Sequence, residues 1–416
     1  MKFDTIIIGG GLSGLVAGIK LQESGQRCAI ISAGQSALHF SSGSFDLLGK
    51  LPDGTDVENP IDGLEHLDSN HPYAYIGRHA ISEYADDFME MMKRAGVNLV
   101  GSVTRNHFHF TPMGGFKKTW LSLDDYTTFN DPDSLPWKRV AIINFSGFLD
   151  FYTKFFAEEL ENRHLTCKLF SVDLPFIEKI RTNPTEMRSA NIAKTFEYES
   201  NIDEFVKRIE PLIKDVEAVV LPAVFGLSSD KPLKYLKSKI AKDVCTITTM
   251  PPSVPGIRVQ QCLVKYFIRQ GGTFMLGDTV NRAEVEGNQV QGIYTTNHSD
   301  IMLMADHYIL ASGSFFSRGI IAQPNLVYEP VFDLDVYYEE DRSNWYDKDI
   351  FAQQKYMSFG VIPTRDFHAM RRNTPVSNLY VIGSVLSGYN ALYEECGGGV
   401  AIMTAMHVAN NLLTNK

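Results

Sequence analysis

The sequence predicts an α/β fold with a parallel sheet, a β-meander and an inserted second α/β region. Three observations lead to this prediction. A strand, a glycine turn, a helix and a second strand fit within the first 32 residues, which is the pattern of a βαβ unit. Apolar runs of strand length then alternate with helical patterns through residues 139–248. Short strand-like runs and further glycine clusters follow residue 272.

The N-terminal unit opens with the apolar, β-branched run Thr5–Ile8. A helix is predicted over Leu12–Ser24, because its large apolar residues recur at helical spacing and Gly25 stands where a helix commonly ends. Cys28–Ile31 is the next buried strand. A short crossover through a helix makes the two strands parallel neighbours.

The remaining elements are predicted from the same two periodicities. In the middle of the chain we expect strands at Arg139–Phe145, Thr166–Ser171, Ala218–Leu221 and Val244–Thr248. Helices are expected at Ile81–Ala95, Leu149–Asn162, Ile202–Ile213, Lys231–Ile240 and Ile257–Arg269. The meander is expected at Thr273–Met275, Val280–Val285 and Val290–Thr296, followed by strands Tyr308–Ala311 and Leu379–Ile382 and a closing helix Gly397–Leu413.

Composition excludes several classes of function. The 416 residues carry 39 Lys and Arg against 49 Asp and Glu, a formal net charge of −10. An acidic chain repels phosphate backbones and anionic lipid, which argues against nonspecific nucleic-acid binding and polybasic membrane attachment. The five cysteines form no CxxC pair, so no zinc, iron–sulfur or disulfide framework is indicated. The opening residues lack a signal-peptide pattern, and we expect a soluble cytosolic protein.

The turn after the first strand matches GxGxxG at Gly9, Gly11 and Gly14. The first glycine allows a sharp turn, the second lets a diphosphate approach the backbone, and the third lets the helix pack on the strand. The helix that follows, beginning with Leu12 and Ser13, offers unpaired N–H groups to an anion. The motif therefore predicts a Rossmann-like, FAD/NAD(P)-binding fold.

One expected residue is missing from this site. Dinucleotide sites usually carry an acidic residue at the end of the second strand, where it holds the adenosine ribose. Here that position is Ser32, a hydroxyl that substitutes weakly. The departure argues against NAD and makes FMN, a flavin without adenosine, a candidate.

Three later glycine sites favour a flavin over a simple nucleotide. Ser312 and Gly313 follow a strand, as in the strand-to-loop crossing of flavoproteins with two dinucleotide-binding domains. Gly383 and Ser384 end a later strand, where such flavoproteins place Gly-Asp against the ribityl chain. A third cluster opens the last helix, where N–H groups can stabilise negative charge on a reduced flavin; it comprises Gly397, Gly398 and Gly399.

Several blocks together resemble one family. They are the opening fingerprint, Gln35–Leu48 (QSALHFSSGSFDLL), Met250–Arg258 (MPPSVPGIR), Ala311–Phe316 (ASGSFF) and Glu395–Val400 (ECGGGV). Over essentially the whole chain the sequence is similar to the B subunits of anaerobic glycerol-3-phosphate dehydrogenases.

The resemblance implies an FMN-dependent subunit, with FAD as the alternative flavin. Its implied partners are a catalytic A subunit, which bears FAD, and a membrane-bound iron–sulfur C subunit. The complex would oxidise sn-glycerol 3-phosphate to dihydroxyacetone phosphate and pass electrons to quinone for fumarate or nitrate respiration. The chain would be cytoplasmic and reach the inner membrane through a partner. Two other functions stay open: an electron-relay or docking subunit, and a self-sufficient FAD oxidoreductase acting on another substrate.

With a flavin in place, the predicted domains are 1–50, 251–330 and 370–416 for the flavin-binding unit. Residues 51–250 are the predicted insertion, and 331–369 a cap segment. The loop after the second strand would pass the flavin ring, and its predicted cofactor ligands are Ser41, Ser42, Gly43 and Ser44.

Two residues are candidates for catalysis. His39 lies in the loop near the expected flavin, although a surface histidine in a turn would look the same. Arg258 follows a proline-rich turn, and its planar guanidinium suits a phosphate or carboxylate. A structural salt bridge explains that arginine equally well.

Overall fold

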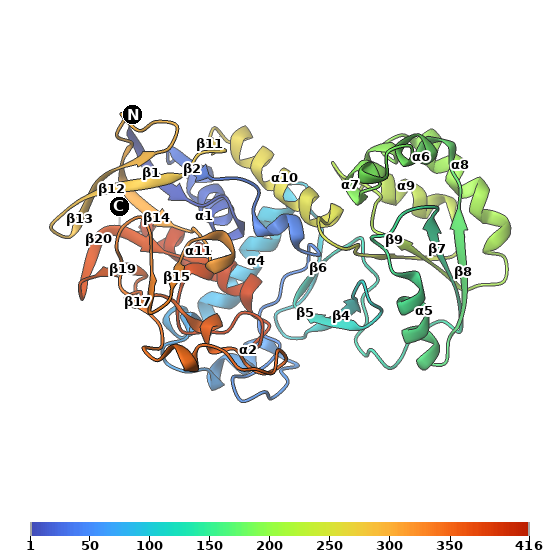
Figure 1. Cartoon of the computed structure of the whole chain (residues 1–416), viewed down its shortest axis with the longest axis horizontal. Helices are drawn as coiled ribbons and strands as arrows, with labels where there is room; N and C mark the ends of the chain where they lie inside the picture. Colours follow the sequence, from blue (N-terminus) through green and yellow to red (C-terminus); the bar gives the residue numbers. More distant parts are fainter. Residues whose placement is uncertain (1, 415–416) are drawn as a thin grey trace.

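The computed structural model describes residues 2–414 and divides into two bodies joined by a narrow waist (Figure 1). The larger body holds both ends of the described chain and a six-stranded sheet of order β11-β2-β1-β14-β20-β19. The smaller body, drawn in green, holds a four-stranded sheet of order β10-β9-β7-β8. The α/β prediction with a parallel sheet is confirmed.

All neighbours in the six-stranded sheet run parallel except the antiparallel pair β19 and β20. Its interior strands β1 and β2 are rich in buried aliphatic side chains, as parallel strands covered on both faces require. The strands are β1 (Lys2–Ile8), β2 (Cys28–Ser32), β11 (Thr273–Leu276), β14 (Met304–Leu310), β19 (His368–Arg371) and β20 (Thr374–Val381).

Helices cover this sheet and complete its core. Helix α1 packs between α11 and α10, and α11 also contacts α3 and α4. The larger body's helices are α1 (Leu12–Glu23), α2 (Pro60–Gly63), α3 (Pro72–Ile76), α4 (Arg78–Arg94), α10 (Val254–Arg269) and α11 (Gly397–Thr414). Within residues 2–414 we find no helix that is both long and apolar enough to span a bilayer.

The four strands of the smaller sheet are all parallel and form a second hydrophobic cluster. They are β7 (Arg139–Phe145), β8 (Thr166–Val172), β9 (Ala218–Pro222) and β10 (Asp243–Ile247). Their helices are α5 (Thr153–Asn162), α6 (Pro175–Arg181), α7 (Ser189–Thr195), α8 (Glu199–Ile209) and α9 (Lys231–Lys239).

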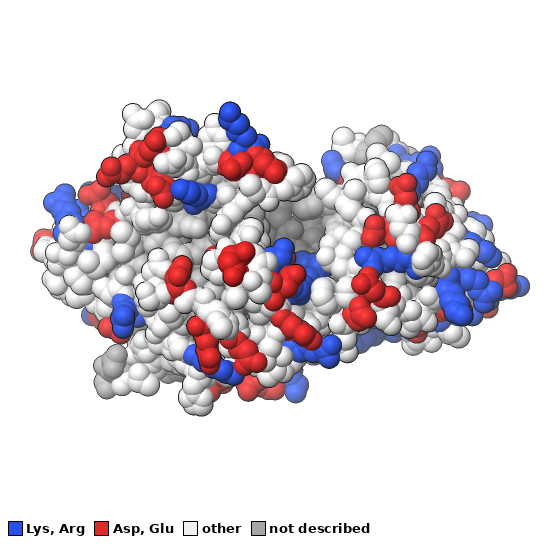
Figure 2. Space-filling view, turned by 90° about the horizontal axis from the view of Figure 1, so that it is seen from below, with Lys and Arg blue, Asp and Glu red and all other residues white. Residues whose placement is uncertain are grey.

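Several short two-stranded sheets lie outside the two main sheets. The hairpin of β4 and β5 lies at the waist (Figure 1). The short strands are β3 (Leu99–Gly101), β4 (His107–Phe110), β5 (Phe116–Thr119), β6 (Leu121–Leu123), β15 (Ile321–Gln323), β16 (Leu326–Tyr328), β17 (Val336–Tyr337) and β18 (Gly360–Val361). Acidic and basic side chains are interspersed over the face shown in Figure 2.

The predicted meander is wrong in its first strand. Strand β11 pairs in parallel with β2 at the edge of the large sheet, because helix α10 returns the chain across that sheet before β11 begins. Only β12 (Val280–Glu286) and β13 (Gln289–Thr295) form the expected antiparallel hairpin.

The predicted domain limits stay a prediction. Buried side chains from Val57 to Val97 belong to the hydrophobic cluster of the larger body, and those from Val140 to Ile247 belong to the cluster of the smaller body.

Candidate functional site

A cavity of about 920 Å³ opens at the carboxyl edge of the six-stranded sheet. The ends of β1, β2 and β14 meet there, which is where parallel α/β sheets commonly bind ligands. Its wall includes residues 8–13, 31–38, 278–281, 311–313, 316–318, 329–331 and 397–398. Segments far apart in the sequence therefore form one site.

The three fingerprint glycines have separate roles. Gly9 has φ +120°, and a Cβ there would stand 2.1 Å from the carbonyl oxygen of Ala311. A Cβ on Gly14 would stand 1.9 Å from the carbonyl oxygen of Gly9, which explains the close packing of α1 on the turn. A Cβ on Gly11 would meet nothing nearer than the Cβ of Ser36, at 4.0 Å, among the described residues. Gly11 thus leaves space on the cavity side.

Gly11 is also the N-cap of α1, and Leu12 and Ser13 are the first two helical residues. The first N–H groups of a helix have no partner within the helix, and they carry its positive dipole end. Leu12 and Ser13 line the cavity with Gly9 and Gly11. The arrangement fits the phosphate of a nucleotide cofactor.

Two buried acceptors in the wall support a polar ligand. The Asp46 Oδ1 and Ser312 Oγ atoms are buried and have no hydrogen-bond partner among residues 2–414. Both residues line the cavity, as does Gly313. Buried polar atoms are nearly always paired in folded proteins, so these two are suited to a bound donor.

At the β2 end of the cavity, the polar side chains are already bonded within the protein. The Ser32 hydroxyl donates to the carbonyl oxygen of Gly34 at 2.9 Å. The buried carboxylate of Asp278 accepts from the N–H groups of Thr279 at 2.9 Å and Asn297 at 3.0 Å. Its other oxygen lies 3.0 Å from His298 Nδ1.

The opposite end is built around the start of α11. Gly397 and Gly398 line the cavity, whereas Gly399 is buried behind them and donates its N–H to the carbonyl oxygen of Asp46 at 2.6 Å. Ser384 is exposed and lines the cavity. Gly383 lies outside the lining, and its N–H donates to Thr404 Oγ1 at 3.0 Å.

The predicted serine loop contributes in part. Ser41 and Ser44 line the cavity, whereas Ser42 and Gly43 lie behind it. The Ser44 Oγ lies 3.1 Å from His109 Nε2.

Lys117 and His109, the partners of Asp46 and Ser44 at this end of the cavity, come from a region where the sequence showed no motif. The Lys117 Nζ lies 2.8 Å from Asp46 Oδ2, and both residues line the cavity. Lys117 and His109 stand on the β4–β5 hairpin. Only the three-dimensional pairing of this hairpin with segment 41–46 brings them to the site.

The two catalytic candidates lie outside the cavity lining. His39 is half-buried on a short 3₁₀ turn, burial lowers its pKa, and its carbonyl accepts the N–H of Ser253 at 2.8 Å. Arg258 is 4% exposed, forms a buried ion pair with Asp125 and donates to the carbonyl oxygen of Gly226 at 3.0 Å. Their catalytic roles stay predictions, and Arg258 has the partners of a structural ion pair.

Sequence reasoning also missed Glu329, a buried carboxyl in the cavity wall. Burial raises its pKa to about 7. Its two oxygens accept the N–H groups of Val331 at 2.9 Å and Phe332 at 2.7 Å. No motif marks this residue, because its environment depends on the fold of the following turn.

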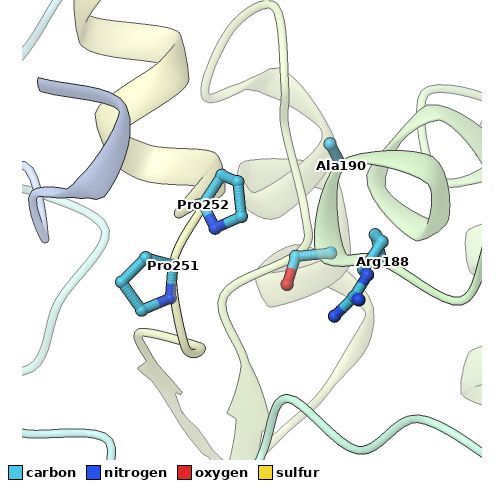
Figure 3. A pocket seen from close by; sticks show the side chains of 5 residues that line it. Arg188, Ala190, Pro251 and Pro252 are labelled. Carbon is cyan, nitrogen blue, oxygen red and sulfur yellow. The ribbon is translucent and has the colours of Figure 1, made fainter. Parts of the chain in front are cut away.

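A second, smaller cavity of about 330 Å³ lies where Pro251 and Pro252 approach α7 (Figure 3). Arg188, which precedes α7, lines it, and the Arg188 Nη1 lies 3.4 Å from Asp150 Oδ1. With a single charged side chain, already paired, this cavity lacks the convergent polar groups of the larger one.

His71, Glu394 and Cys396 place their ligand atoms within 4.8 Å of one another. The His71 Nδ1 accepts the N–H of Tyr73 at 3.1 Å, so the neutral ring carries its proton on Nε2, the nitrogen 3.2 Å from Glu394. A metal would need that nitrogen free of its proton. The cluster is therefore better suited to a hydrogen-bonded role.

Two sequence comparisons agree with a nucleotide-cofactor site in this cavity. The family model described as FAD binding domain matches residues 4–400. A Yersinia enterocolitica protein named as the B subunit of anaerobic glycerol-3-phosphate dehydrogenase is 42% identical over 418 residues, covering 100% of this chain and 99% of the relative. A Pectobacterium atrosepticum protein of the same name is 40% identical over 416 residues, covering 99% of each. Among solved structures, 3-ketosteroid delta1-dehydrogenase from Sterolibacterium denitrificans has a TM-score of 0.45 and 11% identity, with 100% of both chains covered.

Proposed function

The chain belongs to the FAD binding domain family and to the family of anaerobic glycerol-3-phosphate dehydrogenase B subunits, and from this premise we propose that it is the flavin-bearing dehydrogenase subunit of such a complex. The observation that carries the proposal is the open space at Gly11, above the N-terminus of α1 and at the carboxyl edge of a parallel sheet. The sequence prediction of a flavin-dependent dehydrogenase subunit is confirmed at that level.

The chain's own residues would hold the flavin along the cavity. The N–H groups at Gly11, Leu12 and Ser13 would bind the phosphate, and the N–H groups at the start of α11, at Gly397 and Gly398, would stabilise negative charge on the reduced flavin. A bound flavin supplies two-electron chemistry with a substrate and one-electron chemistry with an iron–sulfur partner. Direct flavin contacts by the other predicted ligands remain part of this proposal.

We propose FMN as the resident flavin. The support is at the β2 end, where Ser32 stands in place of the ribose-binding carboxylate and donates to Gly34, and where Asp278 is fully bonded within the protein. FAD is the second candidate. Its support is that the cavity continues past Gly11 to residues 278–281, and that the matching family model is named for FAD.

The proposed substrate is sn-glycerol 3-phosphate, oxidised to dihydroxyacetone phosphate, with electrons leaving toward quinone. The relatives' names place them in a complex of several subunits. The partners that we propose are an FAD-bearing, catalytic A subunit plus a membrane-bound iron–sulfur C subunit, with membrane contact through a partner only. A role limited to electron relay or docking is the rival, and it predicts no substrate oxidation by this chain.

Two measurements test the proposal. The flavin released from the purified chain is identified by mass: FMN supports the proposal and FAD selects the second candidate. Anaerobic addition of sn-glycerol 3-phosphate should then bleach the visible flavin absorbance of the chain. A chain that stays colourless after incubation with either flavin contradicts the flavin site. A flavin-loaded chain that substrate does not bleach, or bleaches only when the FAD-bearing partner is present, contradicts substrate oxidation here and supports the rival.

A further inference from the structure

The β4–β5 hairpin brings a histidine to one end of the cavity. His109 on β4 is paired across the hairpin with Lys117 on β5, so both side chains lie on the same face. That face is turned toward segment 41–46, where His109 meets Ser44 and Lys117 meets Asp46. Ser44, Asp46 and Lys117 line the cavity, and His109 lies directly behind Ser44.

The hydrogen bonds of His109 fix the direction in which a proton can move. Its Nδ1 lies 3.0 Å from the carbonyl oxygen of Phe110, which only accepts, so Nδ1 carries the ring proton. Its Nε2 must then accept from the hydroxyl of Ser44. The Ser42 hydroxyl, 2.5 Å from Ser44 Oγ, donates in turn to Ser44. The result is a directed chain from Ser42 through Ser44 to His109.

The histidine is held rigidly and without a positive charge. His109 is 2% exposed, and its ring stacks on Tyr126 with centroids 5.2 Å apart and 12° between planes. Burial lowers the pKa of His109 to about 4, so the ring is free to accept a proton. The Tyr126 hydroxyl donates to the carbonyl oxygen of Ser42, which fixes the serine segment from the same side.

We propose that Ser44 is the catalytic residue that accepts the hydroxyl proton of an alcohol substrate, and that His109 is the positioning residue that takes the proton from Ser44. The inference rests on the proposed function, which supplies the flavin as oxidant. As the carbinol carbon gives a hydride, two electrons and one proton, to the flavin, its hydroxyl proton passes to Ser44 Oγ. The Ser44 proton moves to His109 Nε2, and the substrate leaves as a ketone.

A weakly basic histidine is sufficient for this step. When the hydride leaves, the substrate oxygen becomes a protonated carbonyl, which is a far stronger acid than an imidazolium. Transfer of the proton from the substrate oxygen through Ser44 to His109 therefore lowers the free energy. General-base assistance of this kind typically contributes about 10²–10⁴-fold in rate. The role of Ser44 is then to connect the open cavity to a base that is itself shielded from water.

The hairpin offers a matched control two residues away on the same strand. His107 is also buried, burial also lowers its pKa to about 4, and its Nε2 lies 2.8 Å from the hydroxyl of Ser122. Ser122 is fully buried and lies outside the cavity lining. The pair His107–Ser122 therefore repeats the local structure of His109–Ser44 without access to a substrate.

The test uses the flavin-loaded full chain without its partner subunits, because the proposed A subunit bears a flavin of its own. It follows reduction of this chain's flavin by sn-glycerol 3-phosphate in a single anaerobic turnover. We expect Ser44→Ala and His109→Gln to slow reduction by roughly 100-fold or more, with the substrate concentration for half-maximal rate nearly unchanged. Ser44→Thr, which keeps the hydroxyl, should retain most of the rate. Ser122→Ala and His107→Gln should stay within about threefold of the wild type.

A second readout does not depend on activity. In protein labelled with ¹⁵N-histidine, the His109 signals should show a protonated Nδ1 and a hydrogen-bonded Nε2, and Ser44→Ala should shift only the Nε2 signal. Ser44→Ala as fast as wild type, or His109 protonated on Nε2, would overturn the inference while leaving the flavin site intact. Equal losses in the control pair would also overturn it, by showing a structural role. A flavin-loaded wild-type chain not reduced by substrate contradicts the proposed function, and the inference with it.

Discussion

The carboxyl ends of the parallel strands lead into very different surroundings in the two sheets of this molecule. After β9, residues Ala223, Val224 and Phe225 are all buried, and the Phe225 ring lies 4.5 Å from that of Phe196 and 5.7 Å from that of Phe205, measured between centroids. After β1, the corresponding turn contains only glycines, and a cavity of about 920 Å³ occupies the edge.

The comparison shows that sheet topology alone does not make a binding site. The smaller sheet is parallel throughout, and the larger one is parallel except for the pair β19 and β20. Helices pack beside the strands of both sheets. At the carboxyl edge of the smaller sheet, the closed edge, the rings of Phe196 and Phe225 fill the space and belong to the core. At the carboxyl edge of the larger sheet, the open edge, the glycine turn has no side chains, so its N–H groups and the space beside Gly11 stay accessible. The four predictions below test this contrast, beginning with the largest expected effect.

Removing the buried ring of Phe225 at the closed edge should destabilise the smaller body and leave the cavity of the larger body unchanged. Phe225→Ala creates a cavity among buried rings, and we expect a loss of about 4 kcal/mol in its free energy of unfolding. Chemical denaturation measures this loss, and flavin titration measures affinity. The control, Phe155→Ala, removes a ring that is 54% exposed and should cost under about 1 kcal/mol. Weakened flavin binding by Phe225→Ala would break the separation between the two edges.

Variants of Arg258 distinguish a structural role of its guanidinium from a catalytic one. Arg258→Leu leaves Asp125 as a buried, uncompensated carboxylate, and we expect a loss of about 3 kcal/mol in the free energy of unfolding. Replacing both partners, as Arg258→Met with Asp125→Leu, should restore most of that stability. The double variant should also reduce its flavin with substrate at nearly the wild-type rate. A stable but inactive double variant would instead assign Arg258 to catalysis.

A side chain at Gly11 should weaken flavin binding strongly without unfolding the chain. Gly11→Val adds a side chain where 4.0 Å of space is available within the protein, so it occupies the phosphate position instead of distorting the turn. We expect flavin affinity to fall at least about 100-fold, or about 2.7 kcal/mol. The melting temperature of the flavin-free chain should hardly change. Gly115→Val, on the β4–β5 hairpin with its nearest neighbour at 3.6 Å, is the control. Unchanged affinity in Gly11→Val would remove the phosphate site.

Local patterns predicted most of the elements and the open edge. Strand β7 was predicted with both ends correct at Arg139–Phe145, because it is a short apolar run that contains Val140, Ile142 and Ile143. The glycine fingerprint likewise predicted the turn and α1, since its conformational demands are local.

Contacts between distant segments could not be predicted. Strand β11 joins β2 about 240 residues away, which no local pattern encodes. The partner of Arg258 is 133 residues distant, and His109 lies 65 residues from Ser44 in a hairpin without motif. The site therefore combines a local signal for the phosphate with nonlocal packing for its chemistry.

The smallest expected effect concerns the pH dependence of stability that Glu329, in the wall of the cavity, produces. Burial raises the pKa of Glu329 to about 7, whereas an unfolded chain has a pKa near the ordinary value of 4.5. Below both values the two states are equally protonated, and as pH rises toward 7 the folded state alone keeps its proton. The folded state therefore loses stability with rising pH, and Glu329→Gln, which cannot ionise, does not. Between about pH 5 and 8, we expect the stability of Glu329→Gln relative to wild type to increase by about 2 kcal/mol in urea unfolding of the flavin-free chain.

The control for this prediction lies on the smaller body. Glu217 is ionised easily, because N–H groups of Lys138 and Arg139 bond its carboxylate and lower its pKa below the ordinary 4.5. Its contribution to stability changes only as pH falls below that value, so Glu217→Gln should track the wild type with a constant offset between about pH 5 and 8. A constant offset for Glu329→Gln too would mean that the open edge admits enough water to keep this carboxylate ionised. The contrast between the two edges would then be one of shape and not of polarity.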